Sequence, residues 1–500
     1  MQRIAVFFFL LTCLASPCYA LVSANVPLGH WSYEAVDRLA NYGLIDGAML
    51  TIKPISRVEM ARHVAAAMVA LDQSNLDLAP IITTVVDRLR EEFKSELIEI
   101  GVLDGMSGKF FLKPVEDPYA RYLYAQNRPD LENMRGDVFE RGSNYRLGFA
   151  ARGRLTDFLG FYLHPEYGGA FSESDRGLDL IEGYGKVMAG PYEVEIGRDS
   201  LWWGPGYRGS ILMSNNAEPF TMIKITNPQP IHLPWVLRYL GPVRAEWFLT
   251  QLEQDRVIPN AKLSGMRINF KPLPWIELGA SRVVMFGGTG APETSFTDYV
   301  KMFFAVSEQA ENNQLAGVDA SILIPVAEMP WLQRLPLRSV KLYVDGAGED
   351  EAGGLPSKWG ALYGLAFNDL FKTGRTDLRF EYAENHVPGL PNVFYAHSLY
   401  KSGYTYEGRI IGHYMGTDTQ QVFMQLSHYV TEDLRLRLSY DRLTHGLSDD
   451  ASRDENIYEC DLMYFRWPNW LVEAAYRYED ASFLSGSDNH IFYMQLIRRF

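Results

Sequence analysis

Polar and apolar side chains alternate along many ten-residue runs from about residue 140 onward. In "LRLRLSYDRL" (434–443), residues 434–441 place three leucines and a tyrosine on one face of an extended chain, and two arginines, a serine and an aspartate on the other. The runs at 192–200, 376–385 and 471–480 repeat this pattern. A tilted membrane strand needs about 9–11 residues, and a barrel places its apolar face toward lipid and its polar face toward the lumen. A soluble sandwich would instead bury the apolar face, mostly in shorter strands.

The number of these runs, one of them at 406–414, predicts an all-β fold: a transmembrane antiparallel β-barrel of about 16–18 strands over residues 115–500. Closure of the barrel would give every backbone N–H and C=O group a hydrogen-bond partner, which lipid cannot supply. Longer polar segments near 285–315, 346–357, 385–405 and 444–456 are expected to be extracellular loops. The last residue, Phe500, follows alternating apolar residues and resembles the signal read by the outer-membrane barrel assembly machinery. We therefore expect the outer membrane as the location, with the lipid bilayer and that machinery as partners.

The N-terminus has the form of a secretory signal peptide over residues 1–24. Arg3 supplies the positive charge, residues 4–14 are apolar but too few to span a bilayer, and Ala20 or Ala24 is the expected last residue before cleavage. A membrane anchor is the alternative. After cleavage Cys460 is the remaining cysteine, so no internal disulfide framework is expected.

Residues 25–114 differ from the rest because their apolar residues recur at helical spacing. Helices are predicted over residues 31–42, 56–71 and 81–100, and Ser56 with Glu59 has the spacing of a capping box. We expect a small α-helical module in the periplasm, ahead of the barrel.

This module resembles the S-layer homology family. The resemblance rests on "HWSYEAVDRLANYGLIDG" and "KPISRVEMARHVAAAM", whose matching positions are His30, Trp31, Ala35, Leu39, Gly43, Leu44, Ser56, Arg57 and Glu59. Such modules bind cell-wall polymers, so the resemblance implies peptidoglycan or an attached polymer as a partner, with Trp31 and Arg57 as binding residues. The alternative is a helical packing module in which Trp31 belongs to the core and Arg57 to a helix cap.

The stretch "DSLWWGPGYRGSILMSNNAEPF" (199–220) interrupts the alternating runs. Trp202 and Trp203 offer ring faces on which sugars could stack, and its Gly-Pro-Gly predicts a sharp turn. Hydrogen-bonding groups for hydroxyls or carboxylates come from Arg198, Asp199, Arg208, Asn215 and Asn216. The same residues could equally fold into the lumen as a plug.

The segment resembles the capsule assembly protein Wzi family of outer-membrane barrels. The resemblance rests on Gly-Arg-Asp at 197–199, Trp-Gly-Pro-Gly at 203–206, Ser210, Ser-Asn-Asn-Ala at 214–217 and Pro219, and the wider likeness covers about residues 115–500. It implies a non-enzymatic, lectin-like barrel that binds and organises capsular or other exported polysaccharide.

Two alternatives compete with this function. A sugar-selective diffusion porin with a cell-wall anchor is the main alternative, since Arg and Glu arrays in the lumen serve either function. An enzyme is not expected, because the chain has no Gly-x-Ser-x-Gly elbow, zinc motif or phosphate loop, so we expect no cofactor and no metal. The net charge of −14 argues against nucleic acid as a partner. Because an acidic surface would repel an acidic capsule, we expect either local Arg/Lys patches on the outer loops or a polymer that is neutral or cation-bridged.

Overall fold

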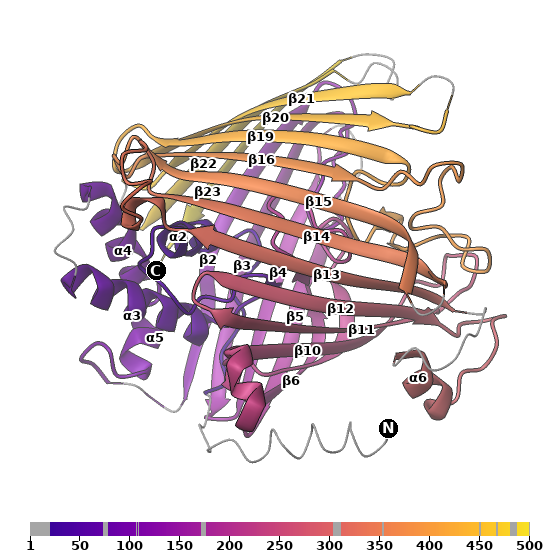
Figure 1. Cartoon of the computed structure of the whole chain (residues 1–500), viewed down its shortest axis with the longest axis horizontal. Helices are drawn as coiled ribbons and strands as arrows, with labels where there is room; N and C mark the ends of the chain where they lie inside the picture. Colours follow the sequence, from indigo (N-terminus) through magenta and orange to yellow (C-terminus); the bar gives the residue numbers. More distant parts are fainter. Residues whose placement is uncertain are drawn as a thin grey trace.

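The computed structural model describes residues 21–73, 79–106, 108, 110–171, 177–303, 312–352, 355–449, 452–466, 469–480 and 488–499. Within these residues, 18 antiparallel strands close into one barrel (Figure 1). Each strand pairs with its neighbour along the chain, and β2 closes the ring against β23, with Ala120 opposite Leu496. The prediction of an all-β antiparallel barrel of about 16–18 strands is confirmed.

The strands of the wall are β2 (Phe111–Ala125), β3 (Gly142–Thr156), β4 (Leu159–Ala170), β5 (Gly177–Ala189), β6 (Tyr192–Asp199), β8 (Phe220–Thr226), β10 (Pro242–Gln251), β11 (Lys262–Leu273), β12 (Ile276–Phe286), β13 (Asn313–Ile324), β14 (Ser339–Ala352), β15 (Leu355–Leu370), β16 (Thr376–Glu384), β19 (Thr419–Tyr429), β20 (Leu434–His445), β21 (Arg453–Tyr464), β22 (Trp470–Asp480) and β23 (Asn489–Arg498). The short β9 (Ile231–His232) extends the pairing at the edge of β10.

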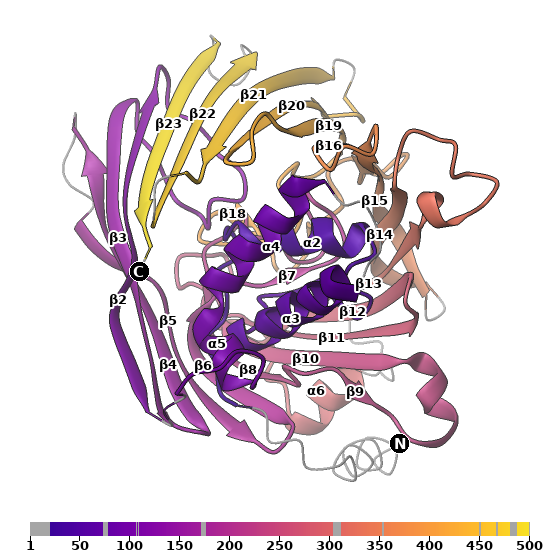
Figure 2. The ribbon, with the colours of Figure 1, turned by 90° about the vertical axis from the view of Figure 1, so that its left-hand side faces the viewer.

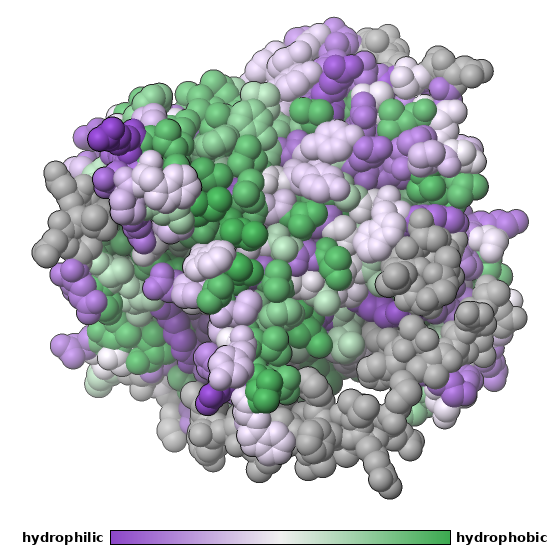
Figure 3. Space-filling view, in the orientation of Figure 1, coloured by the Kyte–Doolittle hydropathy of each residue, from purple (hydrophilic) through white to green (hydrophobic). Residues whose placement is uncertain are grey.

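The wall is apolar outside and charged inside. On β20, Leu438 is 44 % exposed, whereas Arg435 is only 5 % exposed. Figure 3 shows hydrophobic residues gathered over the wall, with more hydrophilic surface toward the two ends of the barrel. This arrangement suits a lipid-facing exterior and a polar lumen. No helix among the described residues is long and apolar enough to cross a membrane.

The helices of the N-terminal region lie inside the ring of strands at one end of the barrel, which we call the helical end (Figure 2). They are α2 (Ser32–Asn41), α3 (Arg57–Gln73), α4 (Pro80–Glu92) and α5 (Lys94–Glu99). Their apolar faces form one core that includes Tyr429 and Met463 of the wall. The helices follow the predicted periodicity, except that the third predicted helix is divided at the buried Phe93. The capping contact is present, because the Glu59 amide donates to Ser56 Oγ at 3.2 Å.

The far end of the barrel, which we call the loop end, carries longer connections and the short helix α6 (Phe296–Phe303), which follows β12 (Figure 1). Two local predictions are wrong. Residues 406–414 do not form a wall strand, because β17 (Thr405–Tyr406) and β18 (Arg409–Ile410) pair only with each other around Gly408, whose φ is +77°. Residues 346–357 are not a long loop, since β14 and β15 extend through most of them.

The structure bears on two boundaries, the start of the barrel and the end of the signal peptide. The barrel begins at Phe111, four residues before the expected position, because β2 already pairs with β3 there. Most of the expected signal peptide lies outside the described residues. Residues 21–24 are described: the Val22 amide donates to Asp157 O at 3.2 Å, and Ala24 O accepts from the Arg57 amide at 2.9 Å. Cleavage after Ala20 rather than Ala24 would keep these contacts.

Candidate functional site in the barrel lumen

The segment 199–220 leaves the wall and folds into the lumen. It departs at the end of β6 and returns at the start of β8, where Asp199 stands opposite Phe220 in the same ladder. Inside the lumen, β7 (Trp202–Trp203) pairs with β1 (Ile52–Lys53), so the segment touches the chain that leads into α3. The Gly-Pro-Gly turn needs its glycines, because a Cβ on Gly206 would lie 2.0 Å from Gly209 O.

The two tryptophans of this segment are enclosed. Trp203 is fully buried, donates from Nε1 to Glu246 Oε1 at 2.7 Å, and packs edge-on against Phe248 at 5.5 Å between ring centroids. Trp202 is 7 % exposed, and the Lys53 ammonium lies 5.5 Å from its ring centroid. Neither ring presents a face on the outer surface.

The polar residues singled out from the sequence are also bound within the chain. Arg198 donates to Glu218 Oε2 at 2.5 Å. Asp199 accepts from Asn25 Nδ2 at 2.7 Å and from Lys224 Nζ at 3.1 Å. These contacts tie the segment to the wall and to the N-terminal region.

The other three polar residues, Arg208, Asn215 and Asn216, connect the segment to the loop end. Arg208 pairs with Glu132 and, through Nε, with Asp441 Oδ2 at 3.0 Å. Asn215 Nδ2 donates to Asn133 O at 3.3 Å, and Asn216 Nδ2 donates to Ile410 O at 3.0 Å. The structure therefore brings Arg208, Asn215 and Asn216 together near residues 130–135, while Arg198 and Asp199 stay at the wall.

The connection 385–418 folds inward onto the same segment. Tyr395 Oη donates to Ile211 O at 2.5 Å, Tyr404 Oη donates to Leu212 O at 2.9 Å, and the Ser214 amide donates to Ile411 O at 2.9 Å. All six residues are buried, and all except the polar Ser214 belong to one apolar core in the lumen. The loop end of the lumen is thus filled by two chain segments packed together.

Charged residues of α2 attach the helices to the wall at the helical end of the lumen. Glu34 lies 2.6 Å from Arg435 Nη1 and 3.3 Å from Arg437 Nη1. Burial alone would raise the pKa of Glu34, but the two guanidinium groups outweigh it and lower the pKa to about 2. Asp37 likewise pairs with Lys341 at 2.7 Å and with Arg379 at 3.2 Å, which hold its pKa well below the usual range against the effect of burial.

Sequence reasoning missed Glu34 and Asp37. They lie one helical turn apart on α2 and therefore on one face, and this spacing of two acidic residues is visible in the sequence. Their partners on β14, β16 and β20 are some 300 to 400 positions away, so no local pattern could assign them.

Trp31 and Arg57 lie within the helical region. Trp31 is 7 % exposed and stacks edge-on against Phe465 at 5.4 Å between centroids. Arg57 is 5 % exposed, and it donates to Glu96 Oε1 at 2.8 Å and to the backbone oxygen of Glu92 at 2.8 Å. Arg57 is thus held by partners within the chain, whereas the Trp31 ring is packed but its buried Nε1 makes no hydrogen bond with the described residues.

A cavity of about 450 Å³ lies between the helices and the segment 199–220. Its lining includes Trp31, Lys53, Trp202, Arg208 and Arg477. The Lys53 ammonium has no hydrogen bond or ion pair with the described residues and lies over the rings of Tyr33 and Trp202. Burial lowers the pKa of Lys53 to about 8, although Asp37 acts in the opposite direction. Between its two filled ends the lumen therefore holds a cavity of ligand size, lined by apolar as well as charged side chains.

A closed ring of strands, apolar outside and charged inside, with both ends of its lumen occupied by the chain itself, defines a membrane-spanning β-barrel with a filled lumen. A family model described as "Capsule assembly protein Wzi" matches residues 124–490. The chain belongs to this family.

Two relatives can be compared directly. Wzi of Escherichia coli, an outer membrane protein involved in group 1 capsule assembly and a carbohydrate-binding β-barrel, superposes with a TM-score of 0.73 at 22 % identity, over 96 % of this chain and 99 % of that one. That likeness supports the fold. An uncharacterized 55.8 kDa protein from the cps region of Klebsiella pneumoniae is 34 % identical over 180 residues, which is 35 % of this chain and 34 % of the relative. The match thus spans about a third of the length of the curated relative.

Proposed function

We propose that this protein is an outer-membrane barrel that binds and organises capsular or other exported surface polysaccharide without catalysing a reaction. Membership of the capsule assembly family supports the substrate class. The observation that carries the proposal is the filled lumen, in which segments 199–220 and 385–418 close one end and the helices close the other. A barrel filled in this way is better suited to holding a polymer at its surface than to passing solutes.

We further propose that the helical end faces the periplasm and that the loop end meets the polysaccharide. Outer-membrane barrels usually have short periplasmic turns and longer extracellular loops, and the longer connections here lie at the loop end. Basic and acidic residues are paired there: Arg128 with Glu140 at 3.3 Å and Arg409 with Asp130 at 2.5 Å. A polymer that carries carboxylates would compete with Glu140 and Asp130 for these guanidinium groups.

In this proposal the helices act as a plug of the lumen. The burial of Trp31 and Arg57 supports a plug over a cell-wall anchor, because a wall polymer would reach them only after the helices had moved. The interior positions of Trp202 and Trp203 likewise support a role in filling the lumen over direct stacking on sugars. The outer-membrane address implies delivery by the barrel assembly machinery.

Two measurements on the full chain test the proposal. Binding of purified capsular polysaccharide to the protein in detergent micelles should be saturable, and the size distribution of the polymer should stay unchanged after incubation. The same protein in a planar bilayer should show no steady conductance. Steady conductance together with no binding of any exported polysaccharide from the same strain would replace this proposal with the sugar-selective porin.

A further inference from the structure

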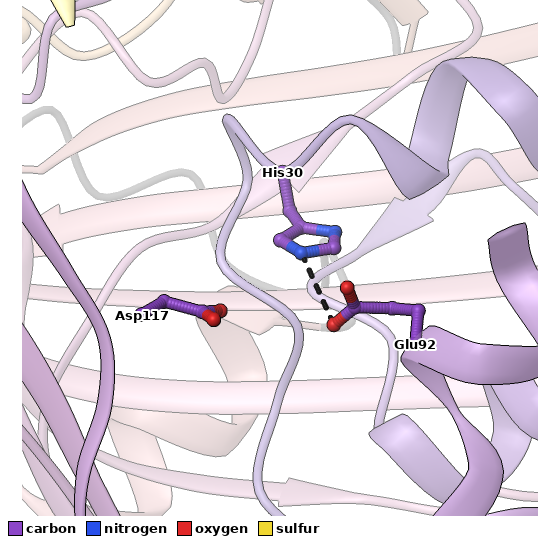
Figure 4. Close-up of side chains that lie close together, drawn as sticks. All are labelled: His30, Glu92 and Asp117. Atoms are coloured by element: carbon purple, nitrogen blue, oxygen red, sulfur yellow. Dashed lines mark ion pairs between the residues drawn. The ribbon is translucent and has the colours of Figure 1, made fainter. Parts of the chain in front are cut away.

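Three metal-ligating side chains from three separate elements meet at the helical end (Figure 4). His30 lies in the turn before α2, Glu92 is the last residue of α4, and Asp117 belongs to β2 of the wall. One ligand atom from each lies within 4.8 Å of the other two, and His30 Nε2 is 3.5 Å from Glu92 Oε1. All three residues are partly buried, so they are not a chance gathering of solvated acids.

Asp117 is directed into this group by an irregularity of its strand. The register of β2 against β3 shifts between Glu116 and Tyr119, and Asp117 has a φ of +46°. Because a bulge lets two consecutive residues leave the strict alternation, Glu116 and Asp117 both face the interior. Glu116 is paired with Arg152 at 2.6 Å. Asp117, in contrast, has no hydrogen bond or ion pair with any residue that the structure describes.

His30 has a nitrogen available to the group. Its Nε2 is buried and makes no hydrogen bond within the described part of the chain. Its Nδ1 accepts from the Ser32 amide at 3.3 Å and lies 2.8 Å from Ser32 Oγ. Metal binding at Nε2 requires the tautomer that carries its proton on Nδ1. That tautomer donates to the Ser32 hydroxyl, gives up the bond from the Ser32 amide, and leaves the lone pair of Nε2 directed at Glu92 and Asp117.

Glu92 is held in place by two arginines, one at each carboxylate oxygen. Arg499 pairs with its Oε2, while Arg57 approaches Oε1 at 3.4 Å and donates to the backbone oxygen at 2.8 Å. Carboxylates that bind metals are commonly supported by such outer hydrogen bonds, which orient the ligand. Oε1 is thereby placed toward His30 and Asp117.

We propose that His30, Glu92 and Asp117 form a binding site for a divalent transition-metal ion of the Zn²⁺ class, which joins the helical plug to the barrel wall. One imidazole nitrogen and two carboxylate oxygens are ligands that Zn²⁺ accepts readily, whereas Ca²⁺ and Mg²⁺ prefer oxygen ligands alone. Two ligands come from the plug and one from the wall, so the bound ion would oppose movement of the plug. This proposal does not depend on the nature of the polysaccharide.

The test uses the full chain in detergent micelles after treatment with EDTA and its removal, titrated with Zn²⁺ by calorimetry. The informative variants are Asp117→Asn and His30→Gln. Asparagine tolerates the positive φ at position 117, and the carboxylate there has no other partner, so Asp117→Asn should fold normally. Glu91→Gln is the matched control, because it removes a carboxylate next to Glu92 in the sequence. The Glu91 side chain is 66 % exposed.

Wild type and Glu91→Gln should bind one Zn²⁺ per chain, and each informative variant should lose at least about 10-fold in affinity. Zn²⁺ should also raise the thermal unfolding midpoint of the wild type but not that of Asp117→Asn. Absence of stoichiometric Zn²⁺ binding to the wild type, or equal binding by Asp117→Asn, would overturn the proposal. If His30→Gln does not fold, Asp117→Asn alone decides.

Discussion

Replacing Glu34 with glutamine should loosen the helical plug, because this carboxylate is the anionic partner of two wall arginines. Arg435 lies 2.6 Å away and Arg437 3.3 Å away. Neutralising the carboxylate leaves Arg435 without an ion-pair partner among the described residues, whereas Arg437 keeps Asp461 at 2.8 Å. The perturbation therefore falls on the contact between α2 and the wall.

The size of the effect follows from the pKa of Glu34. Its ordinary value is 4.5 and its value in the folded protein is about 2, which corresponds to about 3 kcal/mol in favour of the ionised form. About 3 kcal/mol changes an equilibrium constant by about 100-fold. The fraction of molecules with an undocked plug should rise by about that factor in Glu34→Gln.

Limited proteolysis of the full chain in micelles measures this fraction, since cleavage follows the population of the open form when opening and closing are fast. Cleavage within residues 32–99 should be about 100-fold faster in Glu34→Gln than in wild type. Glu91→Gln should be cleaved at the wild-type rate. Unchanged cleavage of Glu34→Gln, with the barrel still folded by its mobility in unheated gels, would refute the reasoning.

The pH dependence has a defined sign. Because folding lowers the pKa of Glu34, its contribution is fully present above about pH 4.5 and is lost as the pH falls toward about 2. The difference in cleavage rate between wild type and Glu34→Gln should therefore be constant from pH 8 to pH 5. It should shrink in more acidic solution, where an acid-active protease such as pepsin can be used.

Three further changes should have measurable effects on stability. Folding lowers the pKa of Lys53 to about 8, so charging it opposes folding below that pH; Lys53→Met should raise the thermal midpoint at pH 7, and the gain should vanish near pH 10.5. Trp203→Ala should cost about 3–5 kcal/mol in unfolding by urea because the ring is fully buried, and a loss below 1 kcal/mol would contradict its role in the lumen core. Gly206→Ala should destabilise the protein in the same assay, since the new Cβ would meet Gly209 O, whereas Gly185→Ala, with no atom within 4 Å of the added Cβ, should not.

Some predictions succeeded because the relevant signal is local. The alternation in residues 434–443 predicts a strand, and β20 runs from Leu434 to His445. The same alternation failed at 406–414, where the chain makes only the short β17–β18 pair. A period of two shows that a segment can be extended, but membership of the wall also needs neighbours on both sides, which the sequence does not supply.

The helical region shows the same division. Its spacing of apolar residues predicts helices, and α2, α3 and α4 are present. Their position inside the ring depends on contacts such as Arg38 with Asp377 at 3.1 Å, which join distant parts of the chain. The sequence therefore revealed an amphipathic module but not that the barrel interior would bury it.

What the sequence by itself determined is the class of fold, because the side-chain period, strand length and choice of lipid-facing residues are local properties. What only the tertiary structure decided is how the lumen is used. Closure of β2 against β23 creates an interior whose charges need partners, and these come from α2, from Asn25 and from segment 199–220. Pairing of buried charges depends on proximity in space, so the sequence alone could not predict it.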